Sequence, residues 1–214
     1  MEICEIFYSI QGEGVWSGYP TVFVRVSGCN LRCSYCDTTY AFEAGEDFSV
    51  DEIVRRVAEF KVKYVCVTGG EPLLQKETFV LIRALLREGY RVVLETNGSM
   101  DVSPFIEAFR EYGVAFLVSC DIKCPSSGMH RRMRFENIGC LRASDQLKFV
   151  IKNREDYDYA KHLIDEYQPV CVCLFQPVWG TDLRRLAGWM LEDGVDARFS
   201  LQLHKVIWGE RRGV

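Results

Sequence analysis

The stretch TVFVRVSGCNLRCSYCD, residues 21–37, joins an apolar, β-branched run to a short loop with three cysteines. The run is typical of a buried strand. Cys29, Cys33 and Cys36 are spaced CxxxCxxC, so the loop gathers three thiols and no fourth. A closed zinc site normally has four protein ligands, whereas a four-iron cluster held by three cysteines leaves one iron open to a small molecule. The spacing favours such a reactive cluster. The alternative is a structural zinc or iron–sulfur module that recruits a further cysteine, such as Cys66 or Cys120.

Outward from this loop, strand-like apolar runs alternate with helical patterns. Strands are expected at residues 21–26, 64–68, 91–95, 115–119, 146–151 and 170–175, with a last one at 198–203. Helices are expected at about 50–60, opened by a Ser49–Glu52 capping box, and at about 76–88, 103–113, 155–167 and 182–193.

This alternation predicts a parallel sheet with helical crossovers, and about six units are too few for a closed eight-unit barrel. We therefore expect an α/β fold: a partial, open TIM-like β/α barrel of about six parallel strands, in one domain over 1–214. Within it we expect a cluster loop at 28–38 and an irregular insertion at about 120–145.

Polar motifs stand where the expected strands end. They are Gly69-Gly70-Glu71-Pro72, Glu95-Thr96-Asn97-Gly98, Asp121-Ile122-Lys123 and Gln176-Pro177. The carboxyl ends of parallel strands meet at one rim, which is where α/β folds place their sites. The motifs and the cysteine loop are therefore expected to form one site.

The composition narrows the function classes. The chain has 214 residues, is 48% hydrophobic and carries a formal net charge of -4, which does not suggest a general nucleic-acid binder. No apolar run reaches membrane-spanning length and the start does not resemble a secretory signal, so we expect a soluble cytoplasmic protein. The other seven cysteines mostly lie in or beside apolar runs and are expected to be reduced, buried hydrophobes. A basic run at Arg131, Arg132 and Arg134 fits a solvated face or a contact with a partner.

The CxxxCxxC loop, with Tyr35 before its last cysteine, and the turn at 69–72 resemble those of the radical S-adenosylmethionine enzymes. The resemblance implies a [4Fe-4S] cluster on Cys29, Cys33 and Cys36. It also implies S-adenosylmethionine on the open iron, which yields a 5′-deoxyadenosyl radical. The cofactor then supplies the reactive species, and no catalytic side chain is expected.

A narrower resemblance, to the 7-carboxy-7-deazaguanine synthase family, covers nearly the whole chain. It rests on SIQGEG (9–14), CDT (36–38), PSSG (125–128) and QLHKVIWG (202–209). The segment after Cys36 is short, and Asp121-Ile122-Lys123 replaces the Ser-Pro-Lys of many relatives. The alternative is a glycyl-radical-activating or other small radical enzyme, against which the QGEG run and Arg25 argue.

The narrower resemblance implies a reaction of queuosine and 7-deazapurine biosynthesis. In it, 6-carboxy-5,6,7,8-tetrahydropterin contracts to 7-carboxy-7-deazaguanine and releases ammonia. It also implies Mg²⁺ with Thr38 as the single protein ligand, completed by substrate oxygens and water; alternatively the hydroxyl bonds its own backbone. The expected partners are a flavodoxin or ferredoxin as electron donor and a second copy in a homodimer, with no nucleic acid or membrane.

The resemblance also assigns cofactor-binding residues along the rim. Glu71 has helix capping as its alternative role, and Asn97 a plain turn with Gly98. The full cofactor-binding set is Tyr35, Asp37, Gly69, Gly70, Glu71, Glu95, Asn97, Asp121, Lys123, Gln176 and Pro177.

The expected substrate contacts must match a pterin edge and a carboxylate. Glu13 can accept hydrogen bonds from a ring N–H and an amine. Arg25 is a charge inside an apolar strand and needs a partner, either the substrate carboxylate or an internal salt bridge. His204 is expected at a strand end, in substrate contact or in a structural hydrogen bond. The full set is Ile10, Gln11, Gly12, Glu13, Arg25, Thr68 and His204.

Overall fold

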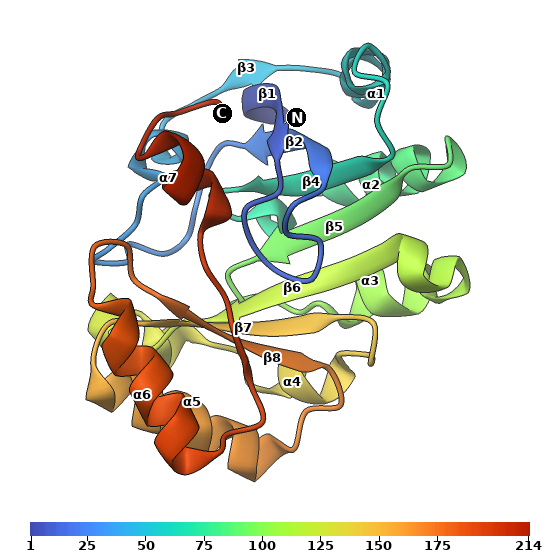
Figure 1. Ribbon diagram of the computed structural model, residues 1–214. Coiled ribbons are helices and arrows are strands. Elements are labelled where there is room, and N and C mark those ends of the chain that lie inside the picture. Colours follow the sequence, from blue (N-terminus) through green and yellow to red (C-terminus); the bar gives the residue numbers. More distant parts are fainter.

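One curved, nine-stranded sheet organises the computed structural model, which describes residues 1–214 (Figure 1). Its order is β3-β1-β2-β4-β5-β6-β7-β8-β9, so β3 and β9 are free edges and the barrel stays open. The parallel strands are β2 (Pro20–Val26), β4 (Tyr64–Gly69), β5 (Arg91–Thr96), β6 (Phe116–Ile122), β7 (Gln146–Ile151), β8 (Val172–Pro177) and β9 (Arg198–Phe199). β1 (Glu2–Ile10) and β3 (Glu46–Asp47) are antiparallel. The partial barrel predicted from the sequence is confirmed.

Six helices cover the outer face of the sheet. They are α1 (Val50–Ala58), α2 (Glu77–Arg87), α3 (Ser103–Ala108), α4 (Glu136–Cys140), α5 (Arg154–Tyr167) and α6 (Leu183–Asp193). The capping box of α1 is present, since Ser49 Oγ accepts from Glu52 N and the Glu52 carboxylate accepts from Ser49 N. A seventh helix, α7 (Leu203–Trp208), lies apart from them near β3 and the chain ends (Figure 1). None of these helices is long and apolar enough to cross a membrane.

Three expectations about the elements are wrong. β1 was not expected; it pairs antiparallel with β2 and extends the sheet beyond the parallel strands. The last strand expected at 198–203 is only the two-residue β9, and the chain then turns into α7. Asp121 and Ile122 belong to β6 itself, because this strand runs beyond residue 119. The insertion expected at 120–145 contains short helical turns, Pro125–Ser127 and His130–Arg132, followed by α4.

The inner face of the sheet changes from apolar to polar within two residues. Phe23, Cys66, Val93 and Leu117 are register neighbours on β2, β4, β5 and β6, and they form a small buried cluster. Side chains on one face recur every second residue, so the next inward row is polar: Arg25, Thr68, Glu95 and Ser119. The apolar row is thus the floor beneath a polar layer at the carboxyl rim.

Candidate active site

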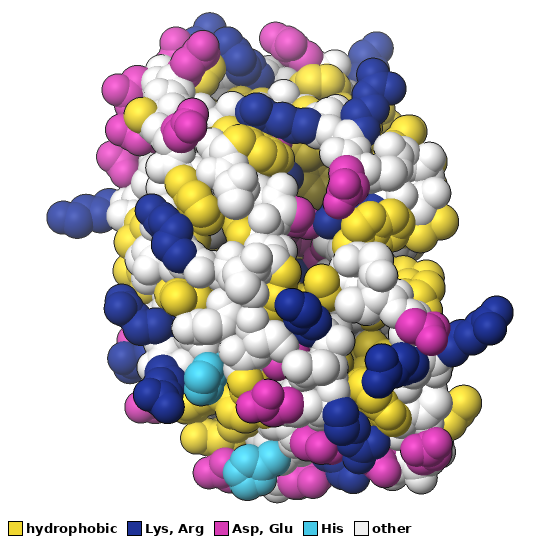
Figure 2. All heavy atoms as spheres, turned by 90° about the vertical axis from the view of Figure 1, so that its left-hand side faces the viewer, with side chains coloured by type: hydrophobic (Ala, Val, Ile, Leu, Met, Phe, Trp, Pro, Cys, Tyr) yellow, Lys and Arg dark blue, Asp and Glu magenta, His cyan; other side chains and the backbone are white.

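A cavity of about 670 Å³ opens at the carboxyl rim of the sheet. Figure 2 looks onto this side of the molecule, where the surface is hollowed. The structure places most predicted site residues along its wall, and Gly12, Glu71 and Pro177 outside it. The predicted residues that line it are Ile10, Gln11, Glu13, Arg25, Cys29, Cys33, Tyr35, Cys36, Asp37, Thr38, Thr68, Gly69, Gly70, Glu95, Asn97, Asp121, Lys123, Gln176 and His204.

The cysteine loop presents three free thiols to this cavity. Ser34 holds the loop against the turn after β6, since its N–H donates to Ser127 O at 3.0 Å and its hydroxyl to Ser126 O at 2.7 Å. Burial raises the pKa of the Cys33 and Cys36 thiols. Metal binding at this loop must therefore displace protons.

The three thiols fit a multi-iron group. Around one zinc ion, sulfurs bonded at about 2.3 Å lie about 3.8 Å apart, and no three His, Cys, Asp or Glu side chains in the chain are placed to hold one ion. A four-iron cluster is larger and fills the space between its ligands. Three cysteines around one cavity suit it, and they would hold three of its irons and leave the fourth free for a small molecule.

The double glycine at the end of β4, Gly69-Gly70, packs directly against the cysteine loop. A Cβ on Gly70 would lie 2.0 Å from Gly28 O, and a Cβ on Gly69 would lie 2.2 Å from Val26 O. The next N–H, of Glu71, donates to Gly28 O at 2.8 Å. Only glycines allow this close approach, so this turn sets the position of the first cluster cysteine.

The side chain of Glu71 acts as a structural cap, which was the expected alternative to cofactor contact. It is fully buried, does not line the cavity, and accepts from Leu73 N at 3.0 Å, Thr96 Oγ1 at 2.8 Å and Asn97 N at 2.7 Å. Burial raises the pKa of this carboxyl, and the hydrogen bonds from Asn97, Leu73 and Thr96 oppose the rise. Glu71 therefore joins the ends of β4 and β5 as a cap, and a contact between its side chain and the cofactor stays a prediction.

Asn97 forms the expected turn and also reaches the cysteine loop. Its Oδ1 accepts from Ser99 N at 3.0 Å, as in an Asx turn. Its Nδ2 donates to Asn30 Oδ1 at 3.0 Å and lies 3.7 Å from Cys29 Sγ. A donor beside a cluster sulfur is one of the features that set a cluster's reduction potential.

Two other predicted residues are placed differently from the expectation, although His204 still lines the cavity. Pro177 ends β8 but lines a separate cavity of about 180 Å³ beside α6. His204 lies in α7 rather than at a strand end, and it packs on Gly12, where a Cβ would lie 1.9 Å from His204 Nδ1. Gly12 thus allows α7 to approach the QGEG loop, and burial lowers the pKa of His204.

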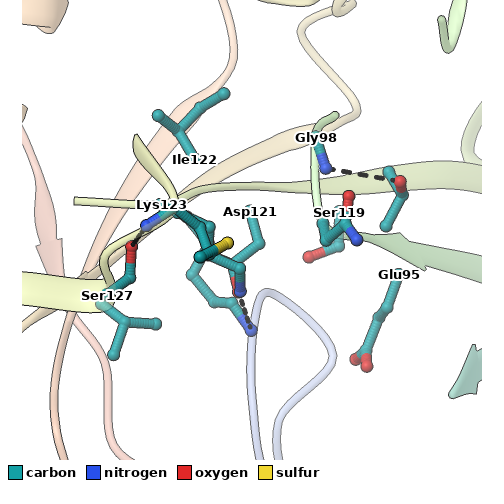
Figure 3. Close-up of polar contacts among 12 residues, drawn as sticks. Glu95, Gly98, Ser119, Asp121, Ile122, Lys123 and Ser127 are labelled. Atoms are coloured by element: carbon teal, nitrogen blue, oxygen red, sulfur yellow. Dashed lines mark hydrogen bonds and ion pairs between the residues drawn. The ribbon is translucent and has the colours of Figure 1, made fainter. Parts of the chain in front are cut away.

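A chain of alternating charges crosses the inner face of β6 and β7. Asp121 Oδ2 lies 2.8 Å from Lys123 Nζ and 3.5 Å from Lys148 Nζ, and Lys148 Nζ lies 2.7 Å from Glu13 Oε2. Figure 3 shows Asp121 and Lys123 with Glu95 nearby on the neighbouring strand. Lys148 was missed in the sequence, although a lysine inside the apolar run QLKFVI is the same signal that identified Arg25.

Two acceptors of the cavity wall have no partner within the protein. Asp121 Oδ1 and Gln176 Oε1 are buried and unpaired, and both residues line the cavity. Buried polar atoms normally find partners. Their position fits a ligand that offers hydroxyl or amine donors, as the sugar and base of S-adenosylmethionine do.

Glu13 is held by two residues that are distant from it in the sequence. Its Oε2 accepts from Lys148, and its Oε1 accepts from Gln202 Nε2 at 3.0 Å. Burial alone would raise the pKa of this carboxyl, but Lys148 and His204 lower it to about 2. Glu13 is therefore an ionised, acceptor-only group at neutral pH.

Arg25 forms the internal salt bridge that was its alternative role. Its Nε donates to Glu5 Oε1 at 2.8 Å, and its guanidinium carbon lies 5.6 Å from the centre of the Phe7 ring. Only Nε is hydrogen-bonded within the protein, so the two terminal nitrogens of this cavity-lining residue keep their donors for a ligand.

Residues 202–205 also bind the end of the cluster loop. Lys205 Nζ lies 2.5 Å from Asp37 Oδ2, and Gln202 Nε2 donates to the same oxygen at 3.2 Å. Thr38 Oγ1 donates to Asp37 Oδ1 at 3.0 Å, so its hydroxyl bonds the neighbouring side chain. Gln202 and Lys205 were not predicted as site residues, because only the fold shows that α7 returns to this loop.

Comparisons with known proteins agree with this geometry. The Radical SAM superfamily model matches residues 23–140. The chain is 39% identical over 214 residues to the 7-carboxy-7-deazaguanine synthase of Thermoplasma acidophilum, with 100% of both chains covered. It is 43% identical over 211 residues to that of Methanospirillum hungatei, covering 97% of this chain and 85% of the relative.

A solved structure supports the fold. The crystal structure of QueE from Escherichia coli matches with a TM-score of 0.75 and 20% identity, over 95% of this chain and 94% of that one. From the cysteine loop, the open barrel and these full-length similarities, we conclude that the chain belongs to the radical SAM superfamily and, within it, to the 7-carboxy-7-deazaguanine synthases.

Proposed function

We propose that this cavity converts 6-carboxy-5,6,7,8-tetrahydropterin to 7-carboxy-7-deazaguanine. Substrate and product differ by one ammonia, so the conversion needs no external oxidant. The family uses a [4Fe-4S] cluster and S-adenosylmethionine, which when bound supply a 5′-deoxyadenosyl radical. The chain's own residues bind and orient the two ligands. The observation that carries the proposal is that one cavity is lined both by an ionised Glu13 and by Arg25, whose terminal nitrogens are free.

Glu13 suits the guanine-like edge of a pterin. A carboxylate has about four acceptor positions, and Lys148 and Gln202 use two of them. The remaining positions can accept from the ring N–H and the exocyclic amine. Gln11 lines the same wall and donates to Glu95 Oε1 at 3.3 Å, so this side chain is held for the rest of the pterin edge.

Arg25 suits the substrate carboxylate. Its terminal nitrogens can form a bidentate pair with a carboxylate, while Glu5 and the Phe7 ring hold the guanidinium in place. Thr68 donates to Glu95 Oε2 at 2.9 Å. We therefore propose Glu95 as part of the substrate wall, because its two oxygens face Thr68 and Gln11 rather than the cysteine loop.

The cofactor side follows from the residues nearest the cysteines. We propose that Cys29, Cys33 and Cys36 hold the cluster and that backbone groups of Gly69 and Gly70 face S-adenosylmethionine. Its sugar and base would meet the unpaired acceptors of Asp121 and Gln176. Thr38, on the cavity wall beside Asp37, would provide the protein oxygen for Mg²⁺.

The proposed electron carrier is inferred from the positive charge near the cysteine loop. The turn after β6 contacts the cysteine loop through Ser34, and exposed Arg131 and Arg132 follow that turn. An acidic carrier such as a flavodoxin would be attracted to this side of the molecule, and the rate of cluster reduction should fall with added salt. A homodimer, proposed on family precedent alone, would show in the molar mass measured by light scattering.

The test is an anaerobic assay with reconstituted cluster, reductant, S-adenosylmethionine, Mg²⁺ and the carboxytetrahydropterin, read by mass spectrometry. We expect the deazaguanine carboxylate and ammonia from the wild type, and neither from Cys33→Ala. Arg25→Ala should keep the cluster absorbance but bind substrate about 10- to 100-fold more weakly, because charged hydrogen bonds are lost. Arg83→Ala, on the exposed side of α2, is the matched control. Formation of 5′-deoxyadenosine without the deazaguanine would point to a different substrate.

A further inference from the structure

Lys148 is a buried cation in the middle of the inner face of β7. Its side chain is 10% exposed and its ammonium lies between the Glu13 and Asp121 carboxylates, at 2.7 Å and 3.5 Å. These acids come from different parts of the site: Glu13 from the QGEG loop, on the proposed substrate side, and Asp121 from the end of β6, on the proposed cofactor side. Lys148 is therefore the one group in contact with both.

We propose that Lys148 is a positioning residue: its ammonium group holds Glu13 as an acceptor-only group and so selects ligands whose ring edge offers two donors. The inference rests on the proposed function, because it deepens the role of Glu13 in recognising the pterin. It assigns specificity to a residue that need not touch the substrate.

Among the groups around Glu13, Lys148 is the main one that keeps its carboxylate ionised. From α7 and the segment before it, Gln202 is neutral. His204 also lowers the pKa of Glu13, but less than Lys148 does, and burial lowers the pKa of His204 itself. Lys205 is paired with Asp37, which itself adds negative charge near Glu13. Glu95 and Asp121 are further acids on the wall of the same cavity. Lys148 is thus the cation hydrogen-bonded to Glu13, and without it burial and neighbouring acids would favour a protonated carboxyl.

Protonation would change which ring edges the site accepts. A carboxylate only accepts hydrogen bonds, whereas a carboxylic acid also donates one. A pterin edge presents a ring N–H and an amine, both donors. A lumazine edge has a carbonyl in place of the amine, so an ionised Glu13 repels it and a protonated Glu13 can donate to it. Sites built for one donor pattern discriminate strongly against the other.

The test compares 6-carboxypterin and 6-carboxylumazine, neither of which needs to react. Their binding to the cluster-loaded protein with S-adenosylmethionine, without reductant, is followed by the fluorescence of the pteridine ring. We expect the wild type to prefer the pterin by at least about 100-fold. In Lys148→Met, pterin binding should weaken about 10- to 100-fold, and the preference should fall below about tenfold.

Two further readouts separate positioning from folding. In Lys148→Met the pterin affinity should fall as pH decreases from 8 to 5, since Glu13 takes up a proton, while the wild type should show no such dependence. Lys148→Arg retains the charge and should keep the preference. Lys161→Met, which removes a partly exposed lysine paired with Asp193, is the matched control and should behave as the wild type.

Each outcome decides between the inference and the function on which it rests. An unchanged preference and pH profile in Lys148→Met would overturn the inference. If that variant does not fold, Lys148→Arg decides, because loss of the preference in a folded, charge-retaining variant would also overturn it. If the wild type binds S-adenosylmethionine but not 6-carboxypterin, the proposed substrate is wrong and the inference falls with it.

Discussion

Replacing Glu71 with glutamine tests whether this residue supports the fold or contacts the cofactor. The carboxylate is fully buried and accepts from two backbone N–H groups, of Leu73 and Asn97, and from the Thr96 hydroxyl. A glutamine keeps one oxygen and replaces the other with an NH₂ group. Whichever way the amide turns, one backbone N–H faces a donor and loses its acceptor.

The magnitude follows from these contacts. An unsatisfied buried N–H costs about 1–3 kcal/mol, and the remaining hydrogen bonds lose the extra strength given by a charged acceptor. The expected loss of stability is therefore about 2–4 kcal/mol. With a urea m-value of about 3 kcal/mol/M, the unfolding midpoint should fall by about 1 M.

The assay is urea unfolding of the cluster-free chain under reducing conditions, followed by circular dichroism. Glu107→Gln, on the exposed side of α3, is the matched control and should change stability by less than about 0.5 kcal/mol. The reasoning is refuted if Glu71→Gln unfolds at the wild-type midpoint. If Glu71→Gln keeps the wild-type midpoint but loses affinity for S-adenosylmethionine, the carboxylate contacts the cofactor and does not support the fold.

Two further predictions concern the cysteine loop. Asn97→Ala removes the donor 3.7 Å from Cys29 Sγ. The reduced cluster then loses stabilisation, and its midpoint potential should become about 20–65 mV more negative. The potential is measured by a redox titration followed by electron paramagnetic resonance, and a wild-type value would exclude this contact. Gly70→Ala places a Cβ 2.0 Å from Gly28 O, so the reconstituted protein should contain less than about half of the wild-type iron. The control is Gly188→Ala, in α6 with open space around its Cβ position, which should retain full iron and gain about 0.5–1 kcal/mol of stability. A wild-type iron content in Gly70→Ala would show that the turn can shift to make room for the Cβ.

The sequence predicted the parallel strands and the gathering of the polar motifs at one rim, because both depend on local patterns. Apolar runs mark the strands, and a charge inside such a run, as at Arg25, marks the inner face where it turns polar. Glu71 could not be assigned in this way. Whether the Glu71 carboxylate caps neighbouring backbone groups or binds a ligand depends on Thr96 and Asn97, which the end of a separate strand brings close to it.

The missed elements have a similar cause. β1 has no helix between it and β2, so the alternation of strands and helices does not reveal it. The strand expected at 198–203 is only the two-residue β9, and α7 begins at Leu203, where that strand was expected to end. Gln202 and Lys205 enter the site only through that helix.

The contacts made by residues 202–205 also have a consequence for the order of events during synthesis. Gln202 is 189 residues from Glu13 and 165 residues from Asp37, yet it is hydrogen-bonded to both. A ribosome adding about 5–20 residues per second reaches Gln202 about 10–30 seconds after Asp37. Throughout that interval the nascent chain carries its three cysteines without the wall that α7 provides. Selective ligand binding is therefore a late property, acquired only once α7 has emerged, and a ribosome stalled before α7 would leave the cysteine loop without that wall.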